Sequence, residues 1–236
     1  MTPTALIVSH GQPSDPAPAE AELALLAAAV QALLPGWQVG SATLAAPGAL
    51  GQSVARLGAV GVVFPMFMAG GWFTRLHLPA RLADVGGRDW RVLEPLGCDP
   101  ALHDLTMRVA VQSGADRLIL AAHGSFKSSA PSDIARHVAS LISAAGVRVE
   151  VGFIDQTPQL DSLHGHGPGS VCLPFFAASG THVTDDIPQA LQTAGFAGRI
   201  LPAIGLHPEV PAIIAAAMRR GQQVCQTACR WQKMTG

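Results

Sequence analysis

The sequence predicts an α/β protein built from two similar lobes, each with a four-stranded parallel sheet flanked by helices. Three observations lead to this class. Short apolar runs alternate with longer Ala-rich runs along the whole chain. The short runs are continuously apolar, which is typical of parallel strands that are covered on both faces. The second half of the chain also repeats motifs of the first half in the same order. Strand–helix alternation with short connections favours a parallel sheet.

The short apolar runs give eight expected strands, four in each half of the chain. They are expected at 5–9, 37–44, 59–67, 90–93, 117–122, 148–154, 170–176 and 199–201. The longer runs between them have helical patterns, and helices are expected at 19–34, 50–57, 76–82, 101–113, 132–145, 185–194 and 210–221. Between the second and third strands of the second half, the Gly-rich segment LDSLHGHGPGSV replaces a helix, and we expect it to be mobile.

Three pairs of segments carry the repeat. LIVSHG pairs with ILAAHG, PMFMAGGWFTRLHLPARL with PFFAASGTHVTDDIPQAL, and LEPLGCDPAL with LPAIGLHPEV; the first members begin at Leu6, Pro65 and Leu93 and the second at Ile119, Pro174 and Leu201. The second member of each pair begins 108 to 113 residues after the first. Such regular spacing indicates a duplicated unit. We therefore expect an N-terminal lobe at 1–114 and a C-terminal lobe at 115–236. A cleft between two α/β lobes is a favoured place for a ligand.

The composition excludes several classes of protein. Charged residues make up 13% and apolar residues 49% of the chain, which is incompatible with intrinsic disorder. Lys and Arg together number 15 against 16 Asp and Glu, for a net charge of −1. A nucleic-acid partner is therefore not expected, because no basic excess could neutralise phosphates. The nine His residues stand out beside the complete lack of Tyr.

Neither a secretory signal nor a membrane partner is expected. The N-terminus has no basic start followed by a long apolar run. The longest apolar stretch, 60–73, is too short to span a bilayer and is interrupted by Pro65, Gly70 and Gly71. A cytoplasmic protein is the expectation.

The four cysteines match no zinc-binding or redox motif. They lie at Cys98, Cys172, Cys225 and Cys229. Cys225 and Cys229 are separated by three residues rather than two, so they do not form the C-x-x-C motif. One helical turn would let these two side chains touch, and reduced structural thiols are expected.

Both halves begin with a strand that ends in His-Gly, at His10 and His123. The second half adds a carboxylate, Asp155, at the end of its second strand and an imidazole, His182, after its third strand. Two neutral imidazoles and a carboxylate can hold a divalent metal with positions left open. The same groups can also take up protons from a substrate. The three strand ends of the C-terminal lobe are therefore the predicted catalytic site.

The N-terminal half keeps only His10 of this set. Phe73 stands opposite His182 in the repeat, and Ala45 stands opposite Asp155. His10 is either a residue of the cleft or a structural remnant. Plainer roles remain open for the other residues too, because a His-Gly pair often forms a hydrogen-bonded turn and Asp155 could cap a turn.

These motifs together resemble the class II tetrapyrrole chelatases, and most closely the sirohydrochlorin chelatases of the CbiX type. The resemblance rests on the His-Gly that ends the first strand, the acid that ends the second, and the pattern P-x7-H-x4-I-P after the third, which begins at Pro174. It implies a chelatase-like fold, with His123 and His182 as metal ligands. The acidic residue of the family, commonly Glu in FLE, falls on Asp155 in FID, and its carboxylate is one methylene shorter.

The resemblance also implies a function. It implies a lyase that inserts Co²⁺ or Fe²⁺, with Ni²⁺ as a further option, into sirohydrochlorin in cobalamin or siroheme biosynthesis. ATP is not implied, since the sequence contains no nucleotide-binding motif. The expected partner is a small tetrapyrrole, with the chain acting as a monomer or homodimer. Ligation needs neutral imidazoles, so activity should fall at low pH. The alternative is a relative that binds a metal or a tetrapyrrole without catalysis.

Four further residues are candidates for binding the substrate. Ser125 and Lys127 follow His123 and could contact carboxylates of the substrate, although Lys127 could equally be an ordinary solvated side chain. Phe73 is a candidate for the floor beneath the macrocycle, with core packing as the simpler account, and His10 is a candidate for the cleft.

His164 and His166 lie in the Gly-rich segment of the second half. A flexible His-x-His could collect metal ions near the site. A solvated loop without such a role is the alternative.

Overall fold

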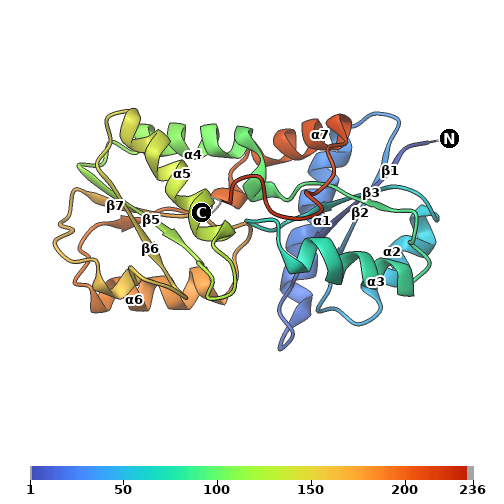
Figure 1. The fold of residues 1–236 in the computed structure, drawn as a ribbon, viewed down its shortest axis with the longest axis horizontal. Coiled ribbons are helices and arrows are strands. Elements are labelled where there is room, and N and C mark those ends of the chain that lie inside the picture. Colours follow the sequence, from blue (N-terminus) through green and yellow to red (C-terminus); the bar gives the residue numbers. More distant parts are fainter. Residues whose placement is uncertain (1, 233–236) are drawn as a thin grey trace. The chain divides into compact units, whose positions relative to one another are not determined.

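The computed structural model describes residues 2–232, which form two compact units. The first unit comprises Met1–Asp99 and Pro208–Cys229, and the second comprises Pro100–His207 and Arg230–Gly236. Each unit contains one four-stranded sheet in which all strands run parallel (Figure 1). The predicted α/β class, with two similar parallel sheets flanked by helices, is confirmed.

The sheet of the first unit has the strand order β2-β1-β3-β4. Its strands are β1 (Thr4–Ser9), β2 (Gln38–Thr43), β3 (Val62–Pro65) and β4 (Arg91–Val92). The helices of this unit are α1 (Pro16–Ala32), α2 (Ala49–Leu57), α3 (Leu78–Asp84) and α7 (Val210–Arg220). The central strand β1 is buried over most of its length, as a parallel strand covered on both faces requires.

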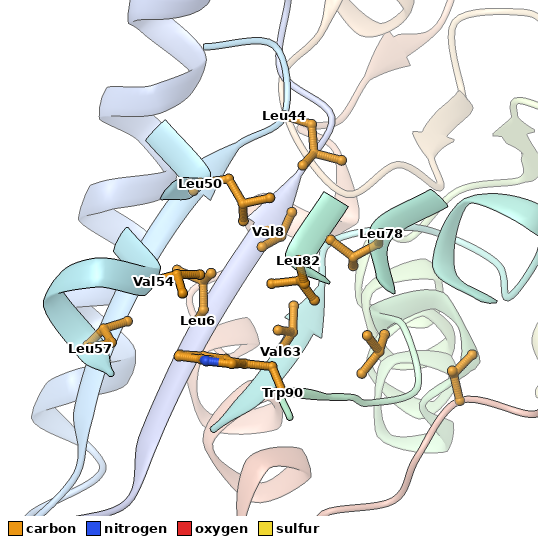
Figure 2. Close-up of a cluster of buried hydrophobic side chains, with 13 residues drawn as sticks. Leu6, Val8, Leu44, Leu50, Val54, Leu57, Val63, Leu78, Leu82 and Trp90 are labelled. Atoms are coloured by element: carbon orange, nitrogen blue, oxygen red, sulfur yellow. The ribbon is translucent and has the colours of Figure 1, made fainter. Parts of the chain in front are cut away.

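The core of the first unit lies between its sheet and two helices. Leu6 and Val8 of β1 belong to one apolar cluster with side chains from α2 and α3, and Figure 2 shows them meeting Leu50, Val54 and, further along, Leu82. Successive residues of a strand point to opposite faces. The intervening buried residues of β1 therefore face the other layer, where α1 and α7 contact each other.

The second unit has the equivalent strand order β6-β5-β7-β8. Its strands are β5 (Arg117–Ala122), β6 (Val149–Phe153), β7 (Ser170–Pro174) and β8 (Arg199–Ile200). Its helices are α4 (Pro100–Gln112), α5 (Ala130–Ala144) and α6 (Ile187–Thr193). The helices α4 and α5 pack together, and α6 packs beside a short 3-10 turn at Leu160–Ser162. Figure 1 shows α4 and α5 on one side of this sheet and α6 on the other.

The repeat extends to individual backbone hydrogen bonds. The N–H of Ala45 donates to the carbonyl oxygen of His10 over 2.9 Å, and the N–H of Asp155 donates to that of His123 over 2.9 Å. A π-helical turn also follows the third strand in both units, at Phe73–His77 and at His182–Asp186. The residues that the sequence repeat aligns therefore occupy equivalent places in the two units.

The last helix of each repeat packs in the unit of the other repeat. We expected a boundary between 114 and 115, but α4 contacts α5 in the second unit, and α7 contacts α1 in the first. The boundary lies instead at Asp99, and the chain returns to the first unit at Pro208. Chain order alone does not encode this exchange, because either repeat could have packed its own last helix.

The Gly-rich segment of the second unit is anchored rather than loose. Leu160 and Leu163 are buried in the apolar cluster of that unit, and His166 is buried as well. The expectation of a mobile, solvated segment is thus corrected, because three of its side chains are held inside the unit.

The cysteines pair differently from the expectation. Helix α7 ends at Arg220, so Cys225 and Cys229 do not lie on a helical turn. The Sγ of Cys229 lies 3.6 Å from that of Cys98 instead, and the thiol of Cys225 donates to Glu94 Oε1 over 3.7 Å. None of the four cysteines, which all lie within the described residues, forms a disulfide.

None of the helices formed by residues 2–232 has the length and apolar character needed to cross a membrane.

Candidate active site

The predicted catalytic residues lie at the carboxyl end of one sheet. His123 directly follows β5, which is the central strand between β6 and β7. Asp155 lies two residues beyond the end of β6, and His182 begins the π-helical turn that follows β7. Carboxyl ends of parallel strands meet at one edge, where ligands of α/β proteins usually bind. The strand order thus brings together three residues that span 59 positions of the chain, from 123 to 182.

The two imidazoles face each other closely. The ring centroids of His123 and His182 are 4.6 Å apart, and the ring planes are nearly perpendicular at 88°. The Nδ1 atom of His123 lies 3.5 Å from Oδ2 of Asp155. The side chains of His123 and Asp155 are each 43% exposed and that of His182 is 44% exposed. All three can therefore be reached from solvent.

Each imidazole has an oxygen acceptor at its Nδ1 atom. Nδ1 of His182 lies 2.6 Å from Oδ2 of Asp186, one turn further along the π-helical segment. Nδ1 of His123 lies 3.1 Å from the carbonyl oxygen of Gly124. A carbonyl oxygen and a carboxylate only accept hydrogen bonds, so a neutral ring must carry its proton on Nδ1 in both cases. Nε2 of each ring then presents the lone pair that a metal ion needs.

The loop after His123 is shaped by Gly124. Its φ is +74°, and a Cβ at this position would lie 2.7 Å from Cγ of Gln156. That glutamine holds the loop, because its Oε1 accepts the backbone N–H of Ser125 over 2.9 Å. The Ser125 hydroxyl oxygen in turn accepts the backbone N–H of Lys127 over 3.1 Å. A residue with a side chain at Gly124 would disturb both contacts.

Ser125 and Lys127 thus lie beside the predicted site, on one tethered loop. Lys127 is exposed, and Phe126 between them is 82% exposed. The Phe176 ring lies 6.5 Å from that of His123 and 6.3 Å from that of His182. The loop that follows His123 thus presents an exposed aromatic ring and an exposed cation within four residues of that imidazole.

The equivalent place in the first unit is filled by aromatic rings. The exposed His10 meets the edge of Phe73 at a centroid distance of 5.2 Å. Phe73 also lies 4.7 Å from the ring of His77 and packs against the apolar cluster of its unit. Ala45 occupies the position equivalent to Asp155, so that position supplies no carboxylate in the first unit. Phe73 therefore has a packing role in its own unit, and its role toward a substrate stays a prediction.

His164 and His166 do not form a metal-binding pair. Nδ1 of His164 lies 3.0 Å from the carbonyl oxygen of Ala194, whereas the side chain of His166 is fully buried, 3.5 Å from Glu150. Burial lowers the pKa of His166, the nearby Glu150 opposes this shift, and the positive charge of Arg117 adds to it. The two rings thus serve separate contacts.

Within residues 2–232, no group of three or more His, Cys, Asp or Glu side chains is arranged to hold a metal ion. The candidate metal site therefore consists of the two facing imidazoles, with Asp155 beside one and Asp186 beside the other.

Sequence reasoning missed three residues around the site. Asp186 had a signal, since it follows His182 by four positions and one helical turn brings such residues together. Gln156 had a weaker signal, because it is a polar residue that directly follows Asp155 in the sequence. Phe126 had none, because an aromatic side chain is usually expected to be largely buried.

Comparisons with known proteins identify the family. A family model named CbiX matches residues 117–220, the part of the chain that contains the whole candidate site. The solved structure of CbiX described as the terminal enzyme for biosynthesis of siroheme in denitrifying bacteria is 42% identical. The match spans 92% of this chain and 98% of the CbiX chain, and the two structures superpose with a TM-score of 0.85. No curated protein sequence matches this chain significantly.

Two structures of SirB share the fold at low identity. SirB from Bacillus subtilis with Fe³⁺ is 16% identical, with a TM-score of 0.73 over 94% of this chain and 96% of its own. The sirohydrochlorin chelatase SirB from Bacillus subtilis subspecies spizizenii, in complex with cobalt, is also 16% identical, with a TM-score of 0.70 over 94% and 95%. Together with the much higher identity to CbiX over nearly the whole length, these matches confirm the resemblance seen in the sequence, and the chain belongs to the CbiX family of class II tetrapyrrole chelatases.

Proposed function

We propose that this protein is a lyase that inserts a divalent metal ion, Fe²⁺ or Co²⁺, into sirohydrochlorin without ATP. The observation that carries the proposal is the pair of facing imidazoles, 4.6 Å apart, at the carboxyl edge of the second sheet in a chain of this family. The 42% identical CbiX is described as an enzyme of siroheme biosynthesis, which supports Fe²⁺ and siroheme over cobalamin. The small tetrapyrrole and the metal are both substrates in this proposal.

In the proposed reaction, a metal ion replaces two protons on the pyrrole nitrogens of the macrocycle. His123 and His182 hold the incoming ion through Nε2, and water occupies its other positions until the pyrrole nitrogens replace it. Asp155 accepts one of the two protons released from the macrocycle, since its carboxylate lies 3.5 Å from His123 and remains open to solvent, and solvent water takes up the other. The balance is one metal ion bound and two protons released.

The surroundings of the site serve the macrocycle in this proposal. Lys127 and the hydroxyl of Ser125 contact acidic substituents of the substrate, and the exposed ring of Phe126 packs against its flat face. In the first unit, Phe73 and His10 are proposed as further contacts to the macrocycle. Asp155 fills the place of the longer Glu of the family, so the Asp155→Glu variant should retain activity whereas Asp155→Ala should lose most of it.

The test is a metallation assay in which sirohydrochlorin absorbance is followed after addition of Fe²⁺, Co²⁺ or Ni²⁺. The wild-type protein should accelerate insertion of Fe²⁺ or Co²⁺ over the uncatalysed rate, and the His123→Ala variant should not. If the wild type binds sirohydrochlorin tightly yet leaves the insertion rate unchanged, the protein is a binding protein and the catalytic proposal fails.

A further inference from the structure

Asp186 contacts the imidazole of His182 more closely than any other acidic group at the site. Its Oδ2 lies 2.6 Å from Nδ1 of His182 across one turn of the π-helical segment. By comparison, the carboxylate of Asp155 lies 3.5 Å from the ring of His123. A short contact between a ring nitrogen and a carboxylate is a strong, charge-assisted hydrogen bond.

This contact determines which ring nitrogen of His182 is free. A neutral imidazole has one N–H donor and one acceptor nitrogen. Because the carboxylate can only accept, the proton resides on Nδ1 and Nε2 keeps its lone pair. A carboxylate at the far nitrogen of a metal-binding histidine also fixes the ring orientation.

We infer that Asp186 is a positioning residue for metal binding, which holds His182 in the Nδ1–H tautomer so that Nε2 faces the metal ion. This inference rests on the proposed function for its biological purpose. It assigns to Asp186 a role distinct from that of Asp155, since Asp186 acts through His182 and does not touch the reacting nitrogens.

The first unit supplies an internal comparison. The equivalent π-helical turn has Phe73 at the position of His182 and His77 at the position of Asp186, with the two rings 4.7 Å apart. The carboxylate is thus missing where the histidine is missing. Stabilising the turn cannot explain the carboxylate, because the first unit forms the same kind of turn without one.

A purely structural role predicts small effects. The side chains of His182 and Asp186 are 44% and 41% exposed, and exposed pairs four residues apart on a helix contribute only about 0.3–0.5 kcal/mol to stability. Loss of a carboxylate that orients a metal-binding histidine instead weakens metal affinity by about 10–100-fold. A structural role and a positioning role of Asp186 therefore predict similar, small changes in stability. They predict different changes in metal affinity.

The experiment uses the full chain without metal and the variants Asp186→Ala and Asp186→Glu. The exposed neighbour Asp185→Ala is the matched control, because it removes the same charge from the same turn. Nitrogen-15 NMR at pH 8 reports the tautomer of His182, whose signals are identified by their loss in His182→Ala. Titration with Co²⁺ alone reports metal affinity, and the metallation assay reports KM for the metal and for sirohydrochlorin separately.

We expect the Nδ1–H tautomer in the wild type and in Asp185→Ala, and a mixture of tautomers in Asp186→Ala. Co²⁺ affinity should fall at least 10-fold in Asp186→Ala and recover in part in Asp186→Glu. KM for the metal should rise while KM for sirohydrochlorin stays unchanged.

An unchanged tautomer in Asp186→Ala, or Co²⁺ affinity within twofold of the wild type, overturns the inference. A wild-type protein that fails to metallate sirohydrochlorin overturns the proposed function instead. The tautomer and Co²⁺ measurements still decide the role of Asp186 in that case, because neither requires catalysis.

Discussion

The two units share one topology and differ in what stands at the carboxyl edge of the sheet. In the second unit, His123, Asp155 and His182 place two imidazoles and a carboxylate in contact with solvent. In the first unit, the equivalent positions carry His10, Ala45 and Phe73, and aromatic rings pack where the second unit has polar groups. The comparison shows that the backbone framework of the site does not depend on its chemistry, since the same hydrogen bonds persist in both units.

The largest expected contrast is between the histidines of the two units. His182→Ala removes one of the two proposed metal ligands and should reduce the metallation rate by about 100-fold or more, which exceeds the effect of about 10–100-fold on losing a group that only orients a ligand. His10→Ala should reduce it less than fivefold, because His10 meets Phe73 at the position where His123 meets His182. Absorbance changes of sirohydrochlorin on metal addition measure both. Equal losses would mean that the two units contribute equally to the reaction.

The next contrast concerns the glycine that follows each first strand. Gly11 has a φ of +75° and Gly124 a φ of +74°. An alanine at either position should destabilise the protein by about 1–2 kcal/mol, because the left-handed conformation is unfavourable for residues with a Cβ. Urea unfolding should show similar losses for both variants, whereas only Gly124→Ala should also impair metallation. Full activity of a folded Gly124→Ala variant would contradict the proposed importance of this loop.

A third contrast appears at the opposite end of the two sheets. Leu57 and His166 hold equivalent positions in the repeat, shortly before β3 and β7. Both side chains are buried. Burial lowers the pKa of His166. The unfolded chain therefore binds a proton more readily, and the free energy of unfolding should decrease as the pH falls below the ordinary histidine value of about 6.5.

His166→Leu should remove this contribution and flatten the dependence of stability on pH between 8 and 5.5. Urea unfolding at both pH values is the measurement, and Leu57→Ala is a control that weakens the other unit without a titrating group. Parallel pH profiles for the wild type and His166→Leu would show that His166 does not titrate in this range.

The smallest expected effect is at the centre of the sheets. Cys172 in β7 and Val63 in β3 hold equivalent positions, and both are fully buried. Cys172→Val should change the free energy of unfolding by less than about 1.5 kcal/mol, as volume-conserving core substitutions do. Burial raises the pKa of Cys172 to about 12, so a thiol reagent at pH 8 should label it only after unfolding. Rapid labelling of the native protein at Cys172 would contradict this description.

Much of the second unit could be predicted from the sequence. Continuous apolar runs located every strand, and the His-Gly motif together with the repeat placed His123, Asp155 and His182 at neighbouring strand ends. These features are local or repeat at a fixed spacing, so they can be read directly. Six of the eight predicted strands were longer than the observed ones, for example 59–67 against Val62–Pro65, whereas 117–122 matched β5 and 5–9 was one residue shorter than β1.

What could not be predicted depends on packing between distant segments. The burial of His166 requires that its segment fold against the sheet, and the Cys98–Cys229 contact requires that the chain return to the first unit at Pro208. The loop that contains the exposed Phe126 is bound by Gln156, thirty residues further along the chain, whose Oε1 accepts the N–H of Ser125. None of these contacts follows from hydrophobic periodicity or from short motifs.

The exchange of α4 and α7 has a consequence for the order in which the protein can fold during synthesis. The strands of the first unit are complete when residue 92 leaves the ribosome, but α7, which contacts α1 and β3, is made more than a hundred residues later. Until then, α1 covers its face of the first sheet without its partner α7. A nascent chain that ends near residue 114 carries α4 without its partner α5, so the first unit reaches its final form only after the second has been synthesised.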